Sequence, residues 1–178
     1  MAKNCILILG GARSGKSRFA QELAAKLGDK VLFVATGAPL DDEMQARIDD
    51  HKKTRPQHWQ TLEISKDIGR KLAKTRGFEV VLVDCLTLLV ANLLGDETEY
   101  RKAEKLVLAE IKGIISAMDR LDATFIFVSN EVGMGLVPDN KLGRVYRDLL
   151  GKANQLLAQH ADEVYFMVAG IPVNVKPA

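Results

Sequence analysis

Gly10-Gly11-Ala12-Arg13-Ser14-Gly15-Lys16-Ser17 is the stretch that decides the fold. It matches the spacing GxxxxGK[ST], follows the apolar run ILIL and precedes the helical stretch RFAQELAAKL, which is the context that a phosphate-binding loop requires. Its glycines let backbone N–H groups curl toward phosphate oxygens, and the following helix adds its positive dipole end. We therefore expect Lys16 to reach the β- and γ-phosphates and the Ser17 hydroxyl to bind Mg²⁺. The alternative is a glycine-rich turn without a ligand.

The rest of the chain alternates between strand-like and helix-like segments. Continuous apolar runs, typical of strands buried on both faces, cover residues 5–9, 31–35, 80–83, 124–129 and 164–169. Helical periodicity covers residues 17–27, 41–53, 66–74, 99–120 and 141–160. This alternation predicts an α/β fold of the P-loop NTPase kind, with a mostly parallel sheet and helices on both faces. Residues 171–175 contain a proline and predict a short edge strand at the C-terminus.

Composition narrows the function classes. The 178 residues fit one domain, residues 1–178, and the net charge of +2 comes from dispersed basic residues, so we expect no nucleic-acid partner. The longest apolar stretch, residues 80–94, is interrupted by Asp84 and Asn92 and is too short to span a membrane. Cys5 and Cys85 lie in apolar runs without metal-ligand spacing, which favours a reducing, cytoplasmic location.

Asp84 ends the apolar run VVLVD. A P-loop enzyme needs a carboxylate near its magnesium ion, commonly at the end of such a strand. An aspartate closing a buried run also needs a cation or hydrogen-bond donors to offset its desolvation. We therefore expect Asp84 to help hold Mg²⁺, directly or through water. The alternative is that Asp84 caps the helix that follows it.

The histidines have competing interpretations. Met44, Ile48 and His51 share one face of the predicted helix 41–53, and a histidine on an apolar helical face is more often a buried core residue than a catalyst. His58 and Trp59 form a polar-aromatic turn that either stacks on a base or closes a loop. His160 fits the C-terminal turn of the last helix.

The segment Asn130-Glu131-Val132-Gly133-Met134-Gly135 follows the apolar run FIFVS. It therefore lies beyond the carboxyl end of a strand, where open α/β sheets bind ligands. We consider Asn130, Glu131, Gly133 and Gly135 as candidates for contact with a substrate. The alternative is an ordinary connecting loop.

Longer motifs resemble a known family. GGARSGKSRFAQ, DDEMQARIDDHKKTRPQHWQTLE, VLVDCLTLLVANLL, SNEVGMGLVP and ADEVYFMVAGIPV are similar to the bifunctional adenosylcobinamide kinase and adenosylcobinamide-phosphate guanylyltransferase of cobalamin biosynthesis. The resemblance covers nearly the whole chain. The patterns HKxxRPxHWxTxE and NEVGxGxVP are far more specific than the phosphate-binding loop alone.

The resemblance implies two reactions. A nucleoside triphosphate, ATP or GTP, phosphorylates the aminopropanol hydroxyl of adenosylcobinamide, and GMP from GTP then joins that phosphate with release of pyrophosphate. The family forms a guanylylated histidine, and the matching residue here is His51. Many relatives carry two adjacent histidines, whereas this chain has Asp50 before His51.

The resemblance also implies a GTP site, a RecA-like fold and a homo-oligomer, expected to be a trimer. Besides the phosphate-binding loop, the implied site contains Val34, Ala35, Thr36, Lys52, Lys53, Thr54, Arg55, Glu63 and Asp84. Two competing hypotheses are a P-loop kinase of another small metabolite, with His51 only structural, and a nucleotide-binding regulatory switch. The sequence has no NKxD motif for reading guanine.

Overall fold

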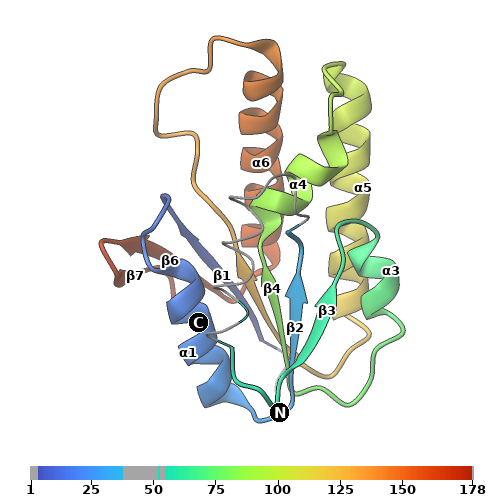
Figure 1. Cartoon of the computed structure of the whole chain (residues 1–178), viewed down its shortest axis with the longest axis vertical. Coiled ribbons are helices and arrows are strands. Elements are labelled where there is room, and N and C mark those ends of the chain that lie inside the picture. The colour runs from blue at the N-terminus through green and yellow to red at the C-terminus, as the bar shows by residue number, and fades with distance from the viewer. Residues whose placement is uncertain (1–3, 38–51, 53–54, 178) are drawn as a thin grey trace.

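The computed structural model describes residues 4–37, 52 and 55–177. Its centre is a seven-stranded sheet in the order β3-β2-β4-β5-β1-β6-β7 (Figure 1). All neighbouring strands are parallel except β6 and β7, which are antiparallel. The strands are β1 Cys5–Gly10, β2 Val31–Ala35, β3 Gln60–Glu63, β4 Val80–Asp84, β5 Thr124–Val128, β6 Glu163–Val168 and β7 Ile171–Lys176.

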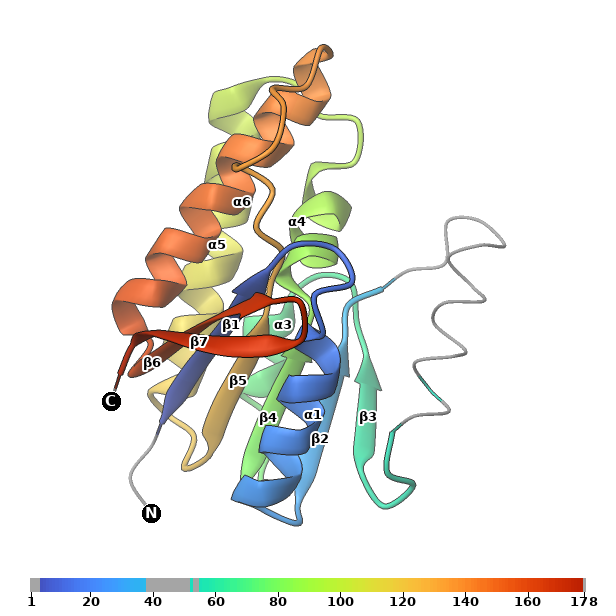
Figure 2. The ribbon, with the colours of Figure 1, turned by 90° about the vertical axis from the view of Figure 1, so that its left-hand side faces the viewer.

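Helices cover both faces of this sheet. Of the described helices, α1 packs on one face, and the others lie on the opposite face (Figure 2). The helices are α1 Lys16–Leu27, α3 Ile68–Leu72, α4 Leu86–Leu94, α5 Tyr100–Met118 and α6 Lys141–His160. The predicted α/β class, mostly parallel sheet and C-terminal edge strand are therefore confirmed.

The apolar pattern of the sequence explains this layering. Successive side chains of a strand point to opposite faces, so β1 directs Leu7 into the layer beneath α4 to α6 and Ile8 into the layer beneath α1. On α6, buried residues recur every four positions at Val145, Leu149 and Ala153, which gives the helix one apolar stripe. The sheet is thus buried on both faces, as its continuous apolar runs predict.

Some element boundaries match the prediction and others differ. The helix predicted over residues 141–160 is present with those limits, and its N-cap, Asn140, accepts a hydrogen bond from the Gly143 N–H at 2.7 Å. The helix predicted over 66–74 is the shorter α3, and the one predicted over 41–53 lies outside the described residues, apart from Lys52. The elements β3 and α4 were not among the predicted ones.

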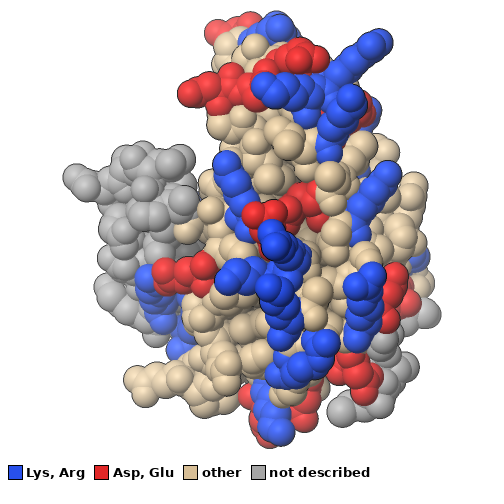
Figure 3. Space-filling view, turned by 90° about the vertical axis from the view of Figure 1, so that its right-hand side faces the viewer, with Lys and Arg blue, Asp and Glu red and all other residues tan. Residues whose placement is uncertain are grey.

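The surface carries both signs of charge. Figure 3 views the side on which α3 and α5 lie, where lysine and arginine side chains cross the face with acidic side chains among and beside them. Within the described part of the chain, no helix combines the length and apolar character needed to cross a membrane.

Candidate active site

The phosphate-binding loop connects the end of β1 to the start of α1, as the sequence predicts (Figure 2). Gly10 has φ +154° and Gly15 has φ +92°, conformations that glycine adopts readily. A Cβ atom at Gly10 would lie 2.7 Å from Ser14 Oγ and 2.8 Å from the Met167 carbonyl oxygen, so a side chain there is excluded. The Gly170 N–H donates to the Ser14 carbonyl oxygen at 3.0 Å, which fixes the loop to the turn between β6 and β7.

Lys16 is buried at the first position of α1. Its Nζ donates a hydrogen bond to the Gly11 carbonyl oxygen at 2.6 Å and lies 3.5 Å from Ser14 Oγ. Burial lowers the pKa of Lys16, while the neighbouring Cys85 and Asp84 oppose that shift. The ammonium group is therefore held inside the curl of the loop, where an incoming phosphate would find a partly desolvated positive charge.

The register of the parallel strands brings the other predicted residues to the same edge of the sheet. Ala35 pairs with Glu63 of β3 on one side and with Asp84 of β4 on the other, and Asp84 in turn pairs with Val128 of β5. Because these positions are the carboxyl ends of parallel strands, Glu63 and Asp84 lie on the edge where this class of sheet binds ligands.

Asp84 is the last residue of β4 and is half-buried. The N-cap of α4 is Cys85, so the alternative in which Asp84 caps that helix is not supported. Its negative charge opposes the lowering of the pKa of both Lys16 and Arg55. Asp84 and the half-buried Ser17 both offer oxygen atoms as ligands, which suit Mg²⁺. This ion usually takes only one or two protein ligands and completes its shell with water and phosphate oxygens.

Arg55 reaches the same edge from the segment before β3. Its guanidinium carbon lies 3.8 Å from the centre of the Phe33 ring, a cation–π contact. Burial lowers its pKa, and Asp84 and Glu63 oppose that shift. Its Nε is buried and forms no hydrogen bond with the described residues. Close by, Lys52 Nζ forms an exposed ion pair with Glu63 at 2.7 Å.

The end of β2 is anchored through its polar groups. The Thr36 hydroxyl donates to the Cys85 carbonyl oxygen at 2.7 Å and accepts from the Cys85 N–H at 2.8 Å, while Asn92 Nδ2 donates to the Thr36 carbonyl oxygen at 2.8 Å. Val34 and Ala35 are buried in the core. We therefore expect any nucleotide contact of these three residues to come from backbone atoms. Burial, and then the charge of Asp84, raise the pKa of the neighbouring Cys85 thiol to about 11.

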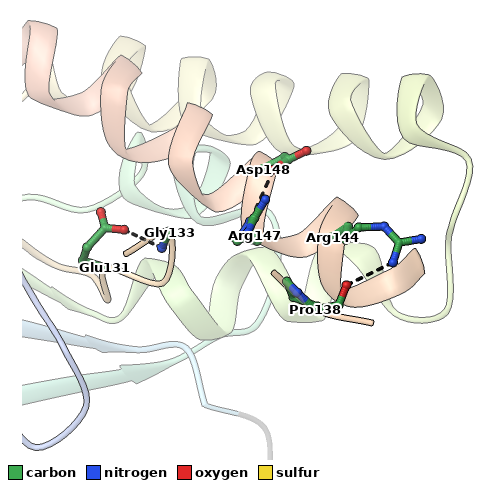
Figure 4. A network of polar contacts seen from close by, with 6 residues as sticks. All are labelled: Glu131, Gly133, Pro138, Arg144, Arg147 and Asp148. Atoms are coloured by element: carbon green, nitrogen blue, oxygen red, sulfur yellow. Dashed lines mark hydrogen bonds and ion pairs between the residues drawn. The ribbon is translucent and has the colours of Figure 1, made fainter. Parts of the chain in front are cut away.

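The segment after β5 adjoins the phosphate-binding loop. The Glu131 N–H donates to the Gly10 carbonyl oxygen at 3.0 Å, and the Asn130 N–H donates to Thr87 Oγ1 at 2.8 Å. The carboxylate of Glu131 accepts a hydrogen bond from the Gly133 N–H (Figure 4). The candidate substrate segment is thus placed beside the predicted phosphate site.

Comparison with known proteins decides the family. The family model described as cobinamide kinase / cobinamide phosphate guanyltransferase matches residues 6–175. The chain belongs to this family. It is 45% identical to the bifunctional adenosylcobalamin biosynthesis protein CobU of Escherichia coli, covering 96% of this chain and 99% of that protein. It is also 42% identical to the corresponding CobP of Pseudomonas aeruginosa, covering 96% of each chain.

A solved structure supports the predicted fold. The RadB recombinase matches with a TM-score of 0.51 at 14% identity, covering 92% of this chain and 73% of that one. The RecA-like P-loop fold is thereby confirmed. As a member of the cobinamide kinase / cobinamide phosphate guanyltransferase family, the chain is an enzyme with kinase and nucleotidyltransferase activity.

The remaining candidate residues from the sequence lie partly outside the described residues and partly away from the phosphate-binding loop. His51, Lys53 and Thr54 lie outside the described residues. Trp59 is buried in the layer on the α1 face, which favours its role in closing a loop, and His58 is exposed. His160 ends α6, and its Nδ1 lies 2.9 Å from the Leu156 carbonyl oxygen, as expected for the last helical turn.

Three supporting residues were not predicted: Thr87, Asn92 and Asn154. Thr87 and Asn154 are buried, and each forms a hydrogen bond with the backbone of Asn130. Asn154 could have been found from the sequence, because it is a polar residue inside the apolar stripe of α6. It lies four positions after Leu150 and three before Leu157. A hollow of about 380 Å³ lies near Phe78 and Leu121, at the amino ends of β4 and β5. It is therefore separate from the candidate site, which lies at the carboxyl ends of the strands.

Proposed function

We propose that this enzyme phosphorylates adenosylcobinamide with ATP or GTP and then transfers GMP from GTP to adenosylcobinamide phosphate, giving adenosylcobinamide-GDP and pyrophosphate. The observation that carries the proposal is Lys16 held in the curl of the phosphate-binding loop, with Asp84 at the carboxyl end of β4 and Arg55 over Phe33 of β2, in a member of this family. Two cations and one carboxylate are the groups needed to hold a triphosphate and its metal.

In the phosphorylation step, the loop N–H groups and Lys16 bind the β- and γ-phosphates. The hydroxyl oxygen of the acceptor bonds to the γ-phosphorus as the bond from that phosphorus to the bridging oxygen breaks, so a nucleoside diphosphate leaves and the hydroxyl proton passes to solvent. Arg55, already held over Phe33, stabilises negative charge on the phosphate oxygens. Positioning and electrostatic stabilisation supply most of the catalysis in such reactions.

In the transfer step, His51 is the nucleophile. A neutral imidazole nitrogen bonds to the α-phosphorus of GTP as the bond to the leaving pyrophosphate breaks. An oxygen of adenosylcobinamide phosphate then bonds to that phosphorus, and the phosphorus–nitrogen bond breaks. His51 directly precedes Lys52, whose ion pair with Glu63 lies at the carboxyl edge, and this supports the assignment. Covalent catalysis divides a difficult transfer between two anions into easier steps.

Ser17 and Asp84 would hold Mg²⁺, which supplies charge neutralisation at the phosphates when bound. Asn130, Glu131, Gly133 and Gly135 would contact the acceptor from the segment beside Gly10. The connection between Glu131 and Gly10 supports this, because a substrate hydroxyl must lie near the γ-phosphate. Lys53 and Thr54 are proposed to complete the nucleotide site.

We also propose that the enzyme is a cytoplasmic homo-oligomer, with a trimer as the expected form. All six residues of β7 are exposed, including Ile171, Val173 and Val175, and the strand ends the sheet. An apolar edge strand is a common contact between subunits. The free cysteines Cys5 and Cys85 fit a reducing compartment.

The test is incubation of the enzyme with adenosylcobinamide, GTP and Mg²⁺, followed by mass spectrometry of the corrinoid. We expect adenosylcobinamide phosphate first and adenosylcobinamide-GDP later, with pyrophosphate. Phosphate product without the GDP product would instead support a simple kinase. Unmodified corrinoid with tightly retained GDP would support the regulatory switch.

A further inference from the structure

A short apolar segment between β5 and α6 projects into solvent. Met134 is 81% exposed, Leu136 is 96% exposed and Val137 is 65% exposed. Single exposed apolar side chains are ordinary, but three within four residues form a local apolar surface. Such a surface commonly marks a place where another molecule binds.

The start of this segment is fixed to the body of the enzyme. The Asn130 N–H donates to Thr87 of α4 at 2.8 Å, and the Asn130 carbonyl oxygen accepts from Asn154 Nδ2 of α6 at 3.2 Å. The next residue, Glu131, donates its N–H to the Gly10 carbonyl oxygen. Two helices and the phosphate-binding loop therefore determine where the segment begins.

The end of the segment is fixed as well, as Figure 4 shows. The guanidinium group of Arg144 donates to the carbonyl oxygens of Pro138 at 3.0 Å and of Asp139 at 2.7 Å. Asn140 caps α6 directly afterwards. With both ends fixed, the outward position of Met134, Leu136 and Val137 follows from the path of the backbone.

We propose that Met134, Leu136 and Val137 bind the apolar face of the corrin ring of the acceptor. This inference rests on the proposed function. The segment begins beside the phosphate site, because the Glu131 N–H donates to the Gly10 carbonyl oxygen, and the ring would bind three to six residues farther along. The chemistry of the segment also suits a corrin, because a corrin is a broad ring that bears amide side chains. The exposed side chains of Met134, Leu136 and Val137 would pack against the face of the ring.

The test compares Leu136→Gln with Leu106→Gln, a matched change at an exposed leucine of α5. Corrinoids absorb visible light, so equilibrium dialysis measures the Kd for adenosylcobinamide directly, and initial rates give KM for adenosylcobinamide and for the nucleotide. We expect Leu136→Gln to raise the Kd and KM for adenosylcobinamide about tenfold, since it removes one buried apolar contact. Leu106→Gln should match the wild type, and Met134→Gln should repeat the effect.

Other outcomes would overturn the inference. Equal corrinoid affinity for Leu136→Gln, Met134→Gln and wild type would remove the segment from the corrinoid site while leaving the proposed function intact. A higher KM for the nucleotide alone would indicate contact with the base. Dissociation of the variant oligomer in sedimentation would indicate a subunit contact. By contrast, a wild-type enzyme that neither binds nor phosphorylates adenosylcobinamide would refute the proposed function itself.

Discussion

Asn154 Nδ2 donates a hydrogen bond at 3.2 Å to the carbonyl oxygen of Asn130, which lies 24 residues earlier in the chain. Asn154 is buried on α6, and its Oδ1 has no partner among the described residues. The bond therefore joins α6 to the first residue beyond β5, next to the phosphate-binding loop. A buried polar residue in this position indicates that the path of the backbone depends on it.

Replacement of Asn154 should affect both stability and acceptor binding. Asn154→Ala leaves the Asn130 carbonyl oxygen without its donor, so we expect the free energy of unfolding to fall by about 1–3 kcal/mol. The loosened segment should raise KM for adenosylcobinamide more than KM for the nucleotide. Urea denaturation and initial rates measure these effects, with the exposed neighbour Gln155→Ala as control. A variant with lower stability but unchanged KM values would show that Asn154 does not position the segment.

Lys16 should be required for both reactions. Its Nζ now contacts the Gly11 carbonyl oxygen and is expected to turn to the triphosphate when the nucleotide binds. Lys16→Ala should lower phosphorylation and GMP transfer by more than about 100-fold each, because a positioned cation is lost. The exposed Lys26→Ala, at the other end of α1, is the control. GMP transfer near the wild-type rate in a folded Lys16→Ala variant would contradict the assignment of the loop to that step.

Asp84 should act through Mg²⁺. Asp84→Asn preserves the shape of the side chain at the end of β4 but removes its charge, so we expect the Mg²⁺ concentration for half-maximal rate to rise. The melting temperature should change little. Magnesium titrations of both activities measure the effect, and Asp122→Asn, at the opposite edge of the sheet, is the control. An unchanged magnesium requirement would mean that Asp84 is not near the ion.

Sequence patterns predicted most of the fold because the central strands and long helices have regular burial. The run 124–129 is continuously apolar, as a strand buried on both faces requires, and the stripe of α6 repeats with the helical period; the structure forms both elements with nearly the same limits. The strand β3 carries no such signal. Its residues Gln60–Glu63 are mostly exposed at the edge of the sheet, and the strand is defined by backbone pairing with β2.

The helix α4 was not predicted for the opposite reason. Residues Leu86–Leu94 are apolar almost all round, because α4 is covered by α5, α6 and the sheet, and such a run has no helical periodicity. In the candidate site, the sequence predicted the loop between β1 and α1 and the position of Asp84 at the end of a strand, while the role of Asp84 stays a prediction. Motif spacing could not predict Thr87, Asn92 or Asn154, because their hydrogen bonds join segments at least 24 residues apart.

The most direct test of the proposed two-step chemistry is substitution of His51, because only the transfer step needs a histidine nucleophile. His51→Asn should leave phosphorylation of adenosylcobinamide largely intact, while adenosylcobinamide-GDP is not formed and adenosylcobinamide phosphate accumulates. Wild-type protein incubated with GTP labelled at the α-phosphate should carry a label that resists alkali and is lost in acid, as expected for a phosphorus–nitrogen bond. The variant should carry none. Parallel loss of both activities, or undiminished labelling of His51→Asn, would contradict the account.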